Sequence, residues 1–154
     1  MSGLPSLHGT VIARSGAGIL LIGPSGAGKS DLALRLIDRG AQLVADDQVL
    51  VEVRDGLIHA TPPARLAGLM EIRGLGIVPM PYVHDIPLSL VVELAAASDV
   101  PRLPEKQQFS LCGVDLPLVR LNAFEVSTPN KIELALTHPE WIASEGDNDR
   151  DTDS

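Results

Sequence analysis

One short stretch of this chain, residues 23–30 with the sequence GPSGAGKS, has the residue types and spacing that phosphate chemistry requires. Gly23, Gly28, Lys29 and Ser30 complete the pattern G-x-x-x-x-G-K-[ST]. In this pattern backbone N–H groups turn inward around a β-phosphate, the lysine reaches β- and γ-phosphate oxygens, and the hydroxyl binds Mg²⁺. The predicted nucleotide-binding residues are Gly23, Pro24, Ser25, Gly26, Ala27, Gly28, Lys29 and Ser30.

Two adjacent carboxylates, Asp46 and Asp47, end the apolar stretch LVADD, which we expect to form a strand beside the loop. Nucleotide-binding folds keep a carboxylate for Mg²⁺ or its water shell at such a position. Because successive strand residues face opposite sides, one carboxylate can serve the metal while the other reaches the attacking nucleophile, provided that the strand bends there. A solvated Asp-Asp turn or a helix N-cap is the alternative.

Three further side chains are candidates on weaker signals. His8 precedes a glycine at the start of the first expected hairpin, where a surface or packing histidine is the simpler interpretation. Glu71 and Arg73 lie two apart in MEIRGLGIVPM, so an extended segment would point both to one face, and Gly74 and Gly76 would let its backbone approach a ligand. A carboxylate suits a metal and a guanidinium suits a phosphate, and a salt-bridged loop is the alternative.

Short strands and tight turns are expected to position these residues. The phosphate-binding stretch follows an apolar strand and opens an amphipathic helix that ends near Gly40, as its chemistry demands. A second helix is expected from Thr128 as N-cap, with Pro129 at its first position, to about Thr137. The stretches expected to form strands are residues 10–15, 18–23, 41–46, 88–94, the hairpin 48–60 turned at Asp55-Gly56, and those on either side of Gly113. So many hairpins favour an α/β fold with a mixed sheet and few helices.

Length and composition limit the classes of function. The 154 residues, 45% of them hydrophobic, predict a single domain over residues 1–143, and the acidic residues 144–154 are expected to be a disordered tail. The 12 Lys and Arg against 20 Asp and Glu give a net charge of -8, which disfavours sequence-independent binding to nucleic acid or to an anionic membrane. The single cysteine and the absence of a leader-like or long apolar run predict a cytoplasmic protein.

Taken together, LHGT, GPSGAGKS, LVADD and EIRGLGI closely resemble, in order and spacing, the catalytic domain of the HPr kinase/phosphorylase family. The resemblance covers roughly residues 8–120. It implies a phosphate loop in a mixed sheet similar to that of phosphoenolpyruvate carboxykinase. It also implies an enzyme that uses ATP or pyrophosphate with Mg²⁺ to phosphorylate a serine of HPr, a small phosphocarrier protein of the sugar phosphotransferase system. Many family members reverse the reaction by phosphorolysis.

The same resemblance assigns roles to the candidate residues. Asp47 would be the catalytic acid and base, with His8 beside it to help set its charge. Lys29 would bind phosphate, and Ser30 and Glu71 would hold Mg²⁺. Asp46 would be a supporting carboxylate, and Arg102, in VPRLPEKQ, would be an active-site arginine on a mobile loop. Arg73 stays a candidate phosphate ligand on the residue pattern described above.

The chain departs from the usual family pattern at two places. It starts almost at His8, as in the short alphaproteobacterial forms without the N-terminal domain, and LVRLNAFEVSTPNK replaces a basic segment of the type P-V-[RK]-x-G-R-N. We therefore expect weak phosphorolysis. Family members are often hexamers, so a homo-oligomer is an expected assembly.

The alternatives are a small-molecule P-loop kinase and a non-catalytic, nucleotide-dependent switch. A small-molecule kinase of this kind usually has an arginine-rich lid and more helix, and this sequence shows neither clearly. A switch needs no base for an incoming hydroxyl, so the pairing of Asp47 with His8 favours an enzyme.

Overall fold

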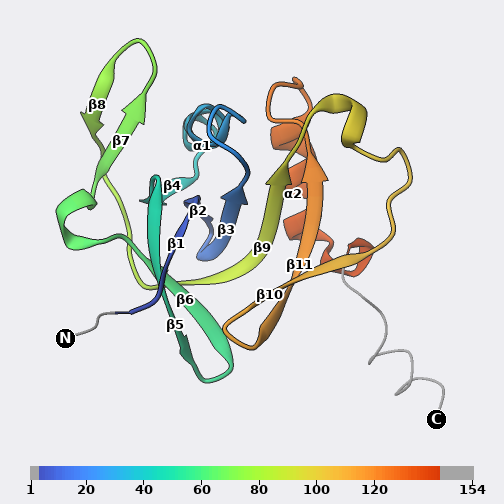
Figure 1. Ribbon diagram of the computed structural model, residues 1–154, viewed down its shortest axis with the longest axis horizontal. Helices are drawn as coiled ribbons and strands as arrows, with labels where there is room; N and C mark the ends of the chain where they lie inside the picture. The colour runs from blue at the N-terminus through green and yellow to red at the C-terminus, as the bar shows by residue number, and fades with distance from the viewer. Residues whose placement is uncertain (1–3, 143–154) are drawn as a thin grey trace.

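The computed structural model describes residues 4–142, which form a mixed sheet covered by few helices (Figure 1). The strands are β1 (Ser6–His8), β2 (Thr10–Arg14), β3 (Ala17–Ile22), β4 (Gln42–Ala45), β5 (Gln48–Arg54), β6 (Leu57–Thr61), β7 (Leu69–Ile72), β8 (Gly76–Pro79), β9 (Ile86–Leu94), β10 (Gln107–Leu111) and β11 (Val114–Leu121). The α-helices are α1 (Lys29–Asp38) and α2 (Thr128–Thr137), and the short 3₁₀ helices are η1 (Ala64–Leu66), η2 (Ala97–Asp99) and η3 (Pro139–Trp141).

Three antiparallel hairpins, β2–β3, β5–β6 and β10–β11, close through turns whose residues have positive φ. The hairpin β5–β6 turns at Asp55 and Gly56, with φ of 55° and 78°. Such turns match the right-handed twist of the strands, and glycine tolerates the left-handed backbone that they need. The three hairpins expected from the sequence are thereby confirmed.

The two α-helices begin and end close to their predicted positions. In α1, Leu32, Ala33 and Leu36 are buried on one face. Gly40 has a φ of 108° and donates its N–H to the carbonyl of Ile37 at 3.0 Å, so it ends the helix as expected. In α2 one detail was wrong, because the N-cap is Ser127. Thr128 is therefore the first helical residue and Pro129 the second.

Strand β9 is the centre of the nine-stranded sheet, which runs β1-β5-β6-β9-β3-β2-β4, with β11 also paired to β9. Strands β3, β9 and β11 are mutually parallel. Ile22 at the end of β3 lies beside Glu93, and Leu94 at the end of β9 lies beside Leu121. The carboxyl ends of these strands, and the loops that follow them, therefore meet at one edge of the sheet. The hairpin β7–β8 forms a separate two-stranded sheet.

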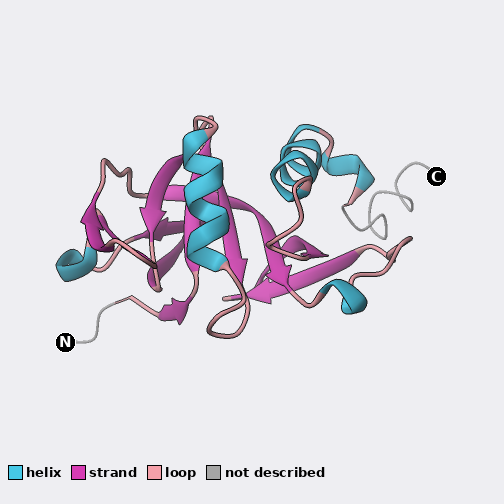
Figure 2. Cartoon of the chain, turned by 90° about the horizontal axis from the view of Figure 1, so that it is seen from above, coloured by secondary structure: helices cyan, strands magenta, loops and turns pink. Residues whose placement is uncertain are grey.

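Both faces of the sheet are packed, because alternate residues of the inner strands point to opposite sides. Ile12, Ile19 and Leu21 pack with residues of α1 and α2 on one face, and Figure 2 shows both helices on that side. Val11 and Leu20 belong to a second cluster, which includes residues of β5, β6 and β11. The expected α/β fold with a mixed sheet and few helices is confirmed.

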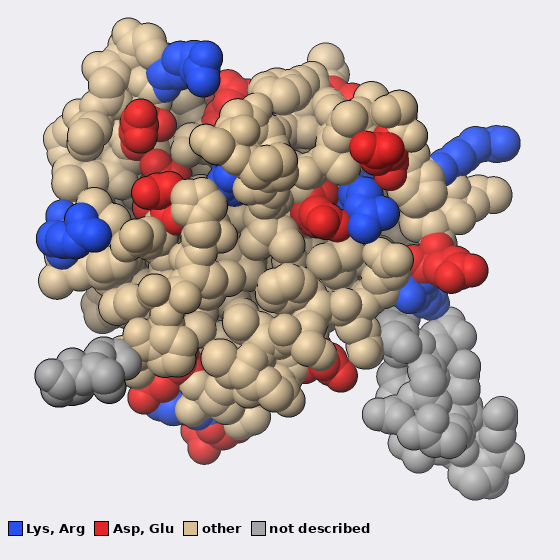
Figure 3. All heavy atoms as spheres, in the orientation of Figure 1, with Lys and Arg blue, Asp and Glu red and all other residues tan. Residues whose placement is uncertain are grey.

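The predicted tail, residues 144–154, lies outside the described residues. No helix within residues 4–142 is long and apolar enough to cross a membrane. On the face drawn in Figure 3, acidic and basic side chains are interspersed, without a broad basic area.

Candidate active site

The predicted phosphate-binding stretch forms the loop between β3 and α1. Its glycines 23, 26 and 28 all have positive φ, of 151°, 86° and 99°. Gly28 is the N-cap of α1, so the loop runs directly into the positive end of the helix dipole. A Cβ atom at Gly23 would lie 3.1 Å from the carbonyl oxygen of Leu94 in the neighbouring strand. The first glycine of the motif is therefore required by close backbone packing as well as by its φ.

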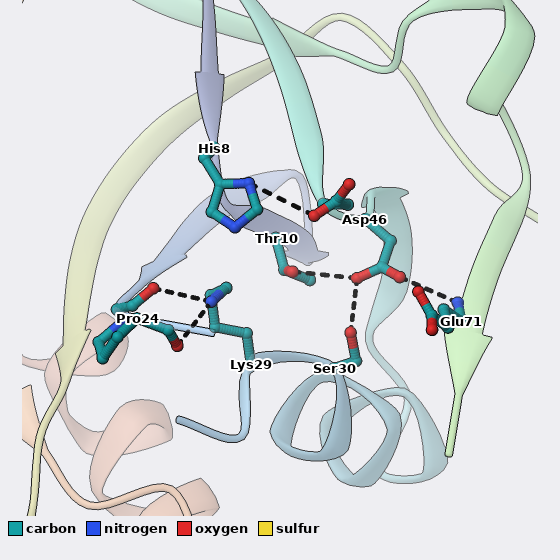
Figure 4. Close-up of polar contacts among 9 residues, drawn as sticks. His8, Thr10, Pro24, Lys29, Ser30, Asp46 and Glu71 are labelled. Carbon is teal, nitrogen blue, oxygen red and sulfur yellow. Dashed lines mark hydrogen bonds and ion pairs between the residues drawn. The ribbon is translucent and has the colours of Figure 1, made fainter. Parts of the chain in front are cut away.

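Lys29 folds back over this loop. Its Nζ donates to the carbonyl oxygens of Gly23 at 2.8 Å and Pro24 at 3.1 Å (Figure 4). These neutral carbonyls hold the ammonium group at the loop without neutralising its charge. The cation is thus positioned for an anion that enters the loop.

The loop also has N–H groups without a protein acceptor. Within residues 4–142, the backbone N–H groups of Gly26, Gly28, Lys29 and Ser30 make no hydrogen bond to another residue. Such donors at a glycine-rich loop and helix N-terminus are the usual cradle for a phosphate. The residues present therefore fit the phosphate chain of a nucleotide.

Asp46 is the centre of a closed polar network and is only 7% exposed. Its Oδ1 accepts hydrogen bonds from the hydroxyl groups of Ser30 at 2.8 Å and Thr10 at 3.0 Å. Its Oδ2 accepts the backbone N–H of Glu71 at 3.0 Å. Thr10 belongs to β2, Ser30 to α1 and Glu71 to β7, and Asp46 directly follows β4, so one carboxylate connects these four elements (Figure 4). The Ser30 hydroxyl and the Asp46 carboxylate form an oxygen donor set that suits Mg²⁺.

Asp47 points away from this network, as expected for adjacent residues where a strand bends. The chain turns there, since Asp47 has a φ of 72° and its carbonyl accepts the N–H of Gly9 at 3.1 Å. His8 is brought alongside because β1 pairs with β5, which places it opposite Gln48. The His8 Nδ1 lies 3.3 Å from the Asp47 Oδ1, and the two side chains are 58% and 65% exposed. Asp47 is therefore open to a substrate.

The hairpin β7–β8 brings Glu71 to the network but carries Arg73 beyond it. The Glu71 side chain is exposed, and only its backbone N–H reaches Asp46. Strand β7 ends at Ile72, so Arg73 lies in the hairpin turn. Among the described residues, Arg73 has no ion-pair or hydrogen-bond partner. The structure thus places Glu71 beside the predicted metal site and leaves the role of Arg73 a prediction.

Arg102 is not brought to this cluster. It is exposed and belongs to the segment between η2 and β10. In Figure 1 this segment lies across the sheet from the hairpin β7–β8. Within residues 4–142 it contacts none of the other candidates by a hydrogen bond or ion pair. Its assignment as an active-site arginine stays a prediction.

The sequence interpretation missed Thr10. It is fully buried and helps to hold Asp46, although no role was given to it. Its position in LHGT, two residues after His8, was the available signal. The sequence alone could not give Thr10 this role, because Thr10 reaches Asp46 only when β2 pairs with β4, where Val11 lies opposite Ala45.

The fold and the site define a phosphate-loop domain on a mixed sheet, with two acidic side chains beside the loop. The family model described as the HPr Serine kinase C-terminal domain matches residues 1–134 of the 154. This chain belongs to that family.

Individual relatives agree with this assignment. The HPr kinase/phosphorylase of Clostridium tetani is 38% identical over 112 residues, which make up 71% of this chain and 36% of that protein. The HPr kinase/phosphorylase of Limosilactobacillus reuteri is 51% identical over 74 residues, or 47% of this chain and 23% of that protein. The chain thus spans between about a quarter and about a third of the length of these relatives.

A solved structure shares the fold. The Hpr(Ser) kinase/phosphatase from Coxiella burnetii superposes with a TM-score of 0.79 at 24% identity, covering 89% of this chain and 91% of that one.

Proposed function

We propose that this protein transfers the γ-phosphate of ATP to a serine hydroxyl of an HPr-type phosphocarrier protein. One observation carries the proposal: the open Asp47 carboxylate, paired with His8, lies next in the chain to the carboxylate that binds Ser30 of the phosphate loop. A potential base is therefore fixed close to the place where the terminal phosphate would be held. A nucleotide-dependent switch would have no use for such a base.

The residues divide the reaction as follows. Lys29 and the free N–H groups of the loop bind the β- and γ-phosphates and oppose the charge that develops during transfer. Asp47 accepts the proton of the substrate serine as its oxygen attacks the γ-phosphorus, while the bond from that phosphorus to the bridging oxygen breaks and ADP leaves. The exposed Asp47 then returns the proton to water.

Ser30 and Glu71 would hold Mg²⁺, with Asp46 as the supporting carboxylate, and the metal would supply charge neutralisation to the phosphates when it is bound. Asp46 already orients the Ser30 hydroxyl and fixes the backbone of Glu71. Pyrophosphate could use the same cradle, because it presents the same kind of oxygens as the nucleotide.

The test is a transfer assay with labelled ATP, Mg²⁺ and a panel of HPr-type proteins. We expect label on a serine of the carrier protein and none with Lys29→Ala, because the loop loses its only side-chain cation. Lys131→Ala is the matched control, since it removes the same charge from α2, where Lys131 pairs with Glu125 of the preceding loop. Label on a small molecule would support the small-molecule kinase instead, and nucleotide binding without transfer would support the switch.

We also propose that the forward reaction exceeds phosphorolysis. Phosphorolysis needs cations for a second anion, and the segment 118–131 offers Arg120 and Lys131. Arg120 lies 2.9 Å from Glu93 and Lys131 lies 3.0 Å from Glu125, so both charges are already paired. Pyrophosphate release from the serine-phosphorylated carrier and phosphate should therefore be much slower than phosphorylation. Comparable rates in both directions would contradict this.

A further inference from the structure

The loop between β11 and α2, residues 122–127, packs directly on the phosphate loop. A Cβ atom at Gly28 would lie 2.7 Å from the Cβ of Ala123 and 2.8 Å from the Cζ of Phe124. Gly28 therefore has no side chain for two reasons, its φ of 99° and the approach of this second loop. The Phe124 ring lies against the last glycine of the phosphate cradle.

The contact between the two loops follows from the topology of the sheet. Because β3, β9 and β11 are parallel and end together, the loops that follow β3 and β11 share one edge. Ligands of parallel α/β sheets bind outside this carboxyl edge. A molecule held at the phosphate loop thus has the loop 122–127 as its neighbour on the β9 and β11 side.

The second loop is held in place by several polar contacts. The Asn122 side chain donates to the carbonyl of Ala95 at 3.0 Å and accepts the N–H of Phe124 at 2.9 Å. Arg35 of α1 donates to the carbonyl of Ala123, which fixes the loop to the same helix that begins at the phosphate site. The position of Phe124 is therefore set before any ligand binds.

Despite this anchoring, the loop leaves apolar side chains uncovered. Phe124 is 62% exposed and Val126 is 93% exposed. The chain has only two phenylalanines, one tyrosine and one tryptophan. Aromatic residues are therefore too rare in this chain for their number to explain an exposed ring beside the phosphate loop. An aromatic face next to a cluster of phosphate donors suits a ligand with one apolar flat end and one anionic end.

The order of the strands fixes which end lies where. Asp46 and Asp47 follow β4, on the β2 side of β3, whereas Phe124 follows β11 on the β9 side. Under the proposed function the γ-phosphate must face Asp47. The rest of the nucleotide then extends toward the opposite side, where Phe124 lies.

We propose that Phe124 is the stacking platform for the nucleobase of the phosphate donor, a binding role that rests on the function proposed above. Stacking of a base on an aromatic ring is expected to contribute about fivefold or more to affinity. The ring would make no contribution to a donor that has no base.

The test compares two probes that share a triphosphate chain, Mg-ATP and Mg-tripolyphosphate, by titration calorimetry on the folded protein. Phe124→Ala should weaken ATP binding about fivefold or more and leave tripolyphosphate binding essentially unchanged. Val126→Ala, two residues away and more exposed, is the matched control and should change neither. Phe124→Trp should keep ATP affinity and give an indole emission that responds to ATP but not to tripolyphosphate, beyond the response of a wild-type control that carries only Trp141.

Each other outcome overturns a specific claim. If Phe124→Ala and Phe124→Leu weaken both probes equally, the ring only shapes the loop, and the nucleobase role is wrong. An unchanged ATP affinity with a raised KM for the carrier protein would place the ring in a protein interface instead. If the wild-type protein binds tripolyphosphate as tightly as ATP, the inference fails while the phosphate site stands. If it binds neither probe, the proposed function itself fails.

Discussion

Asp46 and Asp47 are adjacent and chemically identical, yet the fold gives them opposite surroundings. Asp46 is buried and its oxygens accept hydrogen bonds from three groups of the protein, whereas Asp47 is open to solvent with His8 as its one ion-pair partner among residues 4–142. A carboxylate whose oxygens are already engaged is poorly placed to collect a proton from a substrate. The comparison teaches that position in the hydrogen-bond network, not residue type, separates the positioning carboxylate from the proposed base.

The largest effect is expected from Asp47→Asn. Asparagine keeps the shape but cannot take the serine proton, so the rate of transfer to the carrier protein should fall by about 10²–10⁴. Binding of Mg-ATP should change little, as measured by calorimetry on the same sample. The folded state should also be unaffected, because this side chain is exposed. A large loss of nucleotide affinity, with turnover of bound ATP preserved, would reverse the roles given to the two aspartates.

A smaller effect, on stability, is expected from Asp46→Asn. Asparagine has one acceptor oxygen and adds a donor. The three groups that now donate hydrogen bonds to the Asp46 carboxylate therefore cannot all keep an acceptor. The free energy of unfolding should fall by about 1–3 kcal/mol, measured by chemical denaturation, and more Mg²⁺ should be needed for activity.

The hydroxyl of Thr10 offers a second way to test the buried network. Thr10→Val should lower the free energy of unfolding by about 1 kcal/mol. In a double-mutant cycle with Asp46→Asn the two losses of stability should be non-additive, because the two side chains are in contact. Thr61→Val is a suitable control, since Thr61 is half-buried and its hydroxyl has no hydrogen-bond partner within residues 4–142. Full additivity would show that the network is not a unit.

The smallest effect is expected from His8→Gln. An exposed ion pair contributes about 0.2–1 kcal/mol, so the transfer rate should fall by no more than about fivefold. Steady-state kcat for the carrier protein is the measurement. A loss as large as that of Asp47→Asn would mean that the imidazole itself takes part in moving the proton.

Local features of the fold were predictable, because residues that are adjacent in the sequence determine the type of a turn and the end of a helix. Asp55-Gly56 specifies a tight hairpin wherever it stands, and Gly40 ends α1 for the same kind of reason. The strand order was not predictable from such signals. Nothing in residues 86–94 alone indicates that β9 takes β3, β6 and β11 as neighbours.

The site divides in the same way. Motif and spacing singled out the phosphate loop and the two aspartates as candidates, and the motifs resembled those of a family. The contribution of Thr10 and the contact between Gly28 and Phe124 depend on strand pairs and loops far apart in sequence. Long-range packing of this kind leaves no periodic signal in one sequence.

The central place of β9 has a consequence for how the chain acquires its shape. Strand β3 pairs with β9, which is synthesised about seventy residues later. One edge of β3 therefore stays unpaired for about 4–14 seconds at typical translation rates. During that interval an apolar strand edge next to the glycine-rich loop is open to wrong partners. Such distant pairings also slow folding of the finished chain. Substitutions in β9 should therefore reduce the yield of soluble protein during synthesis by more than their effect on final stability would suggest.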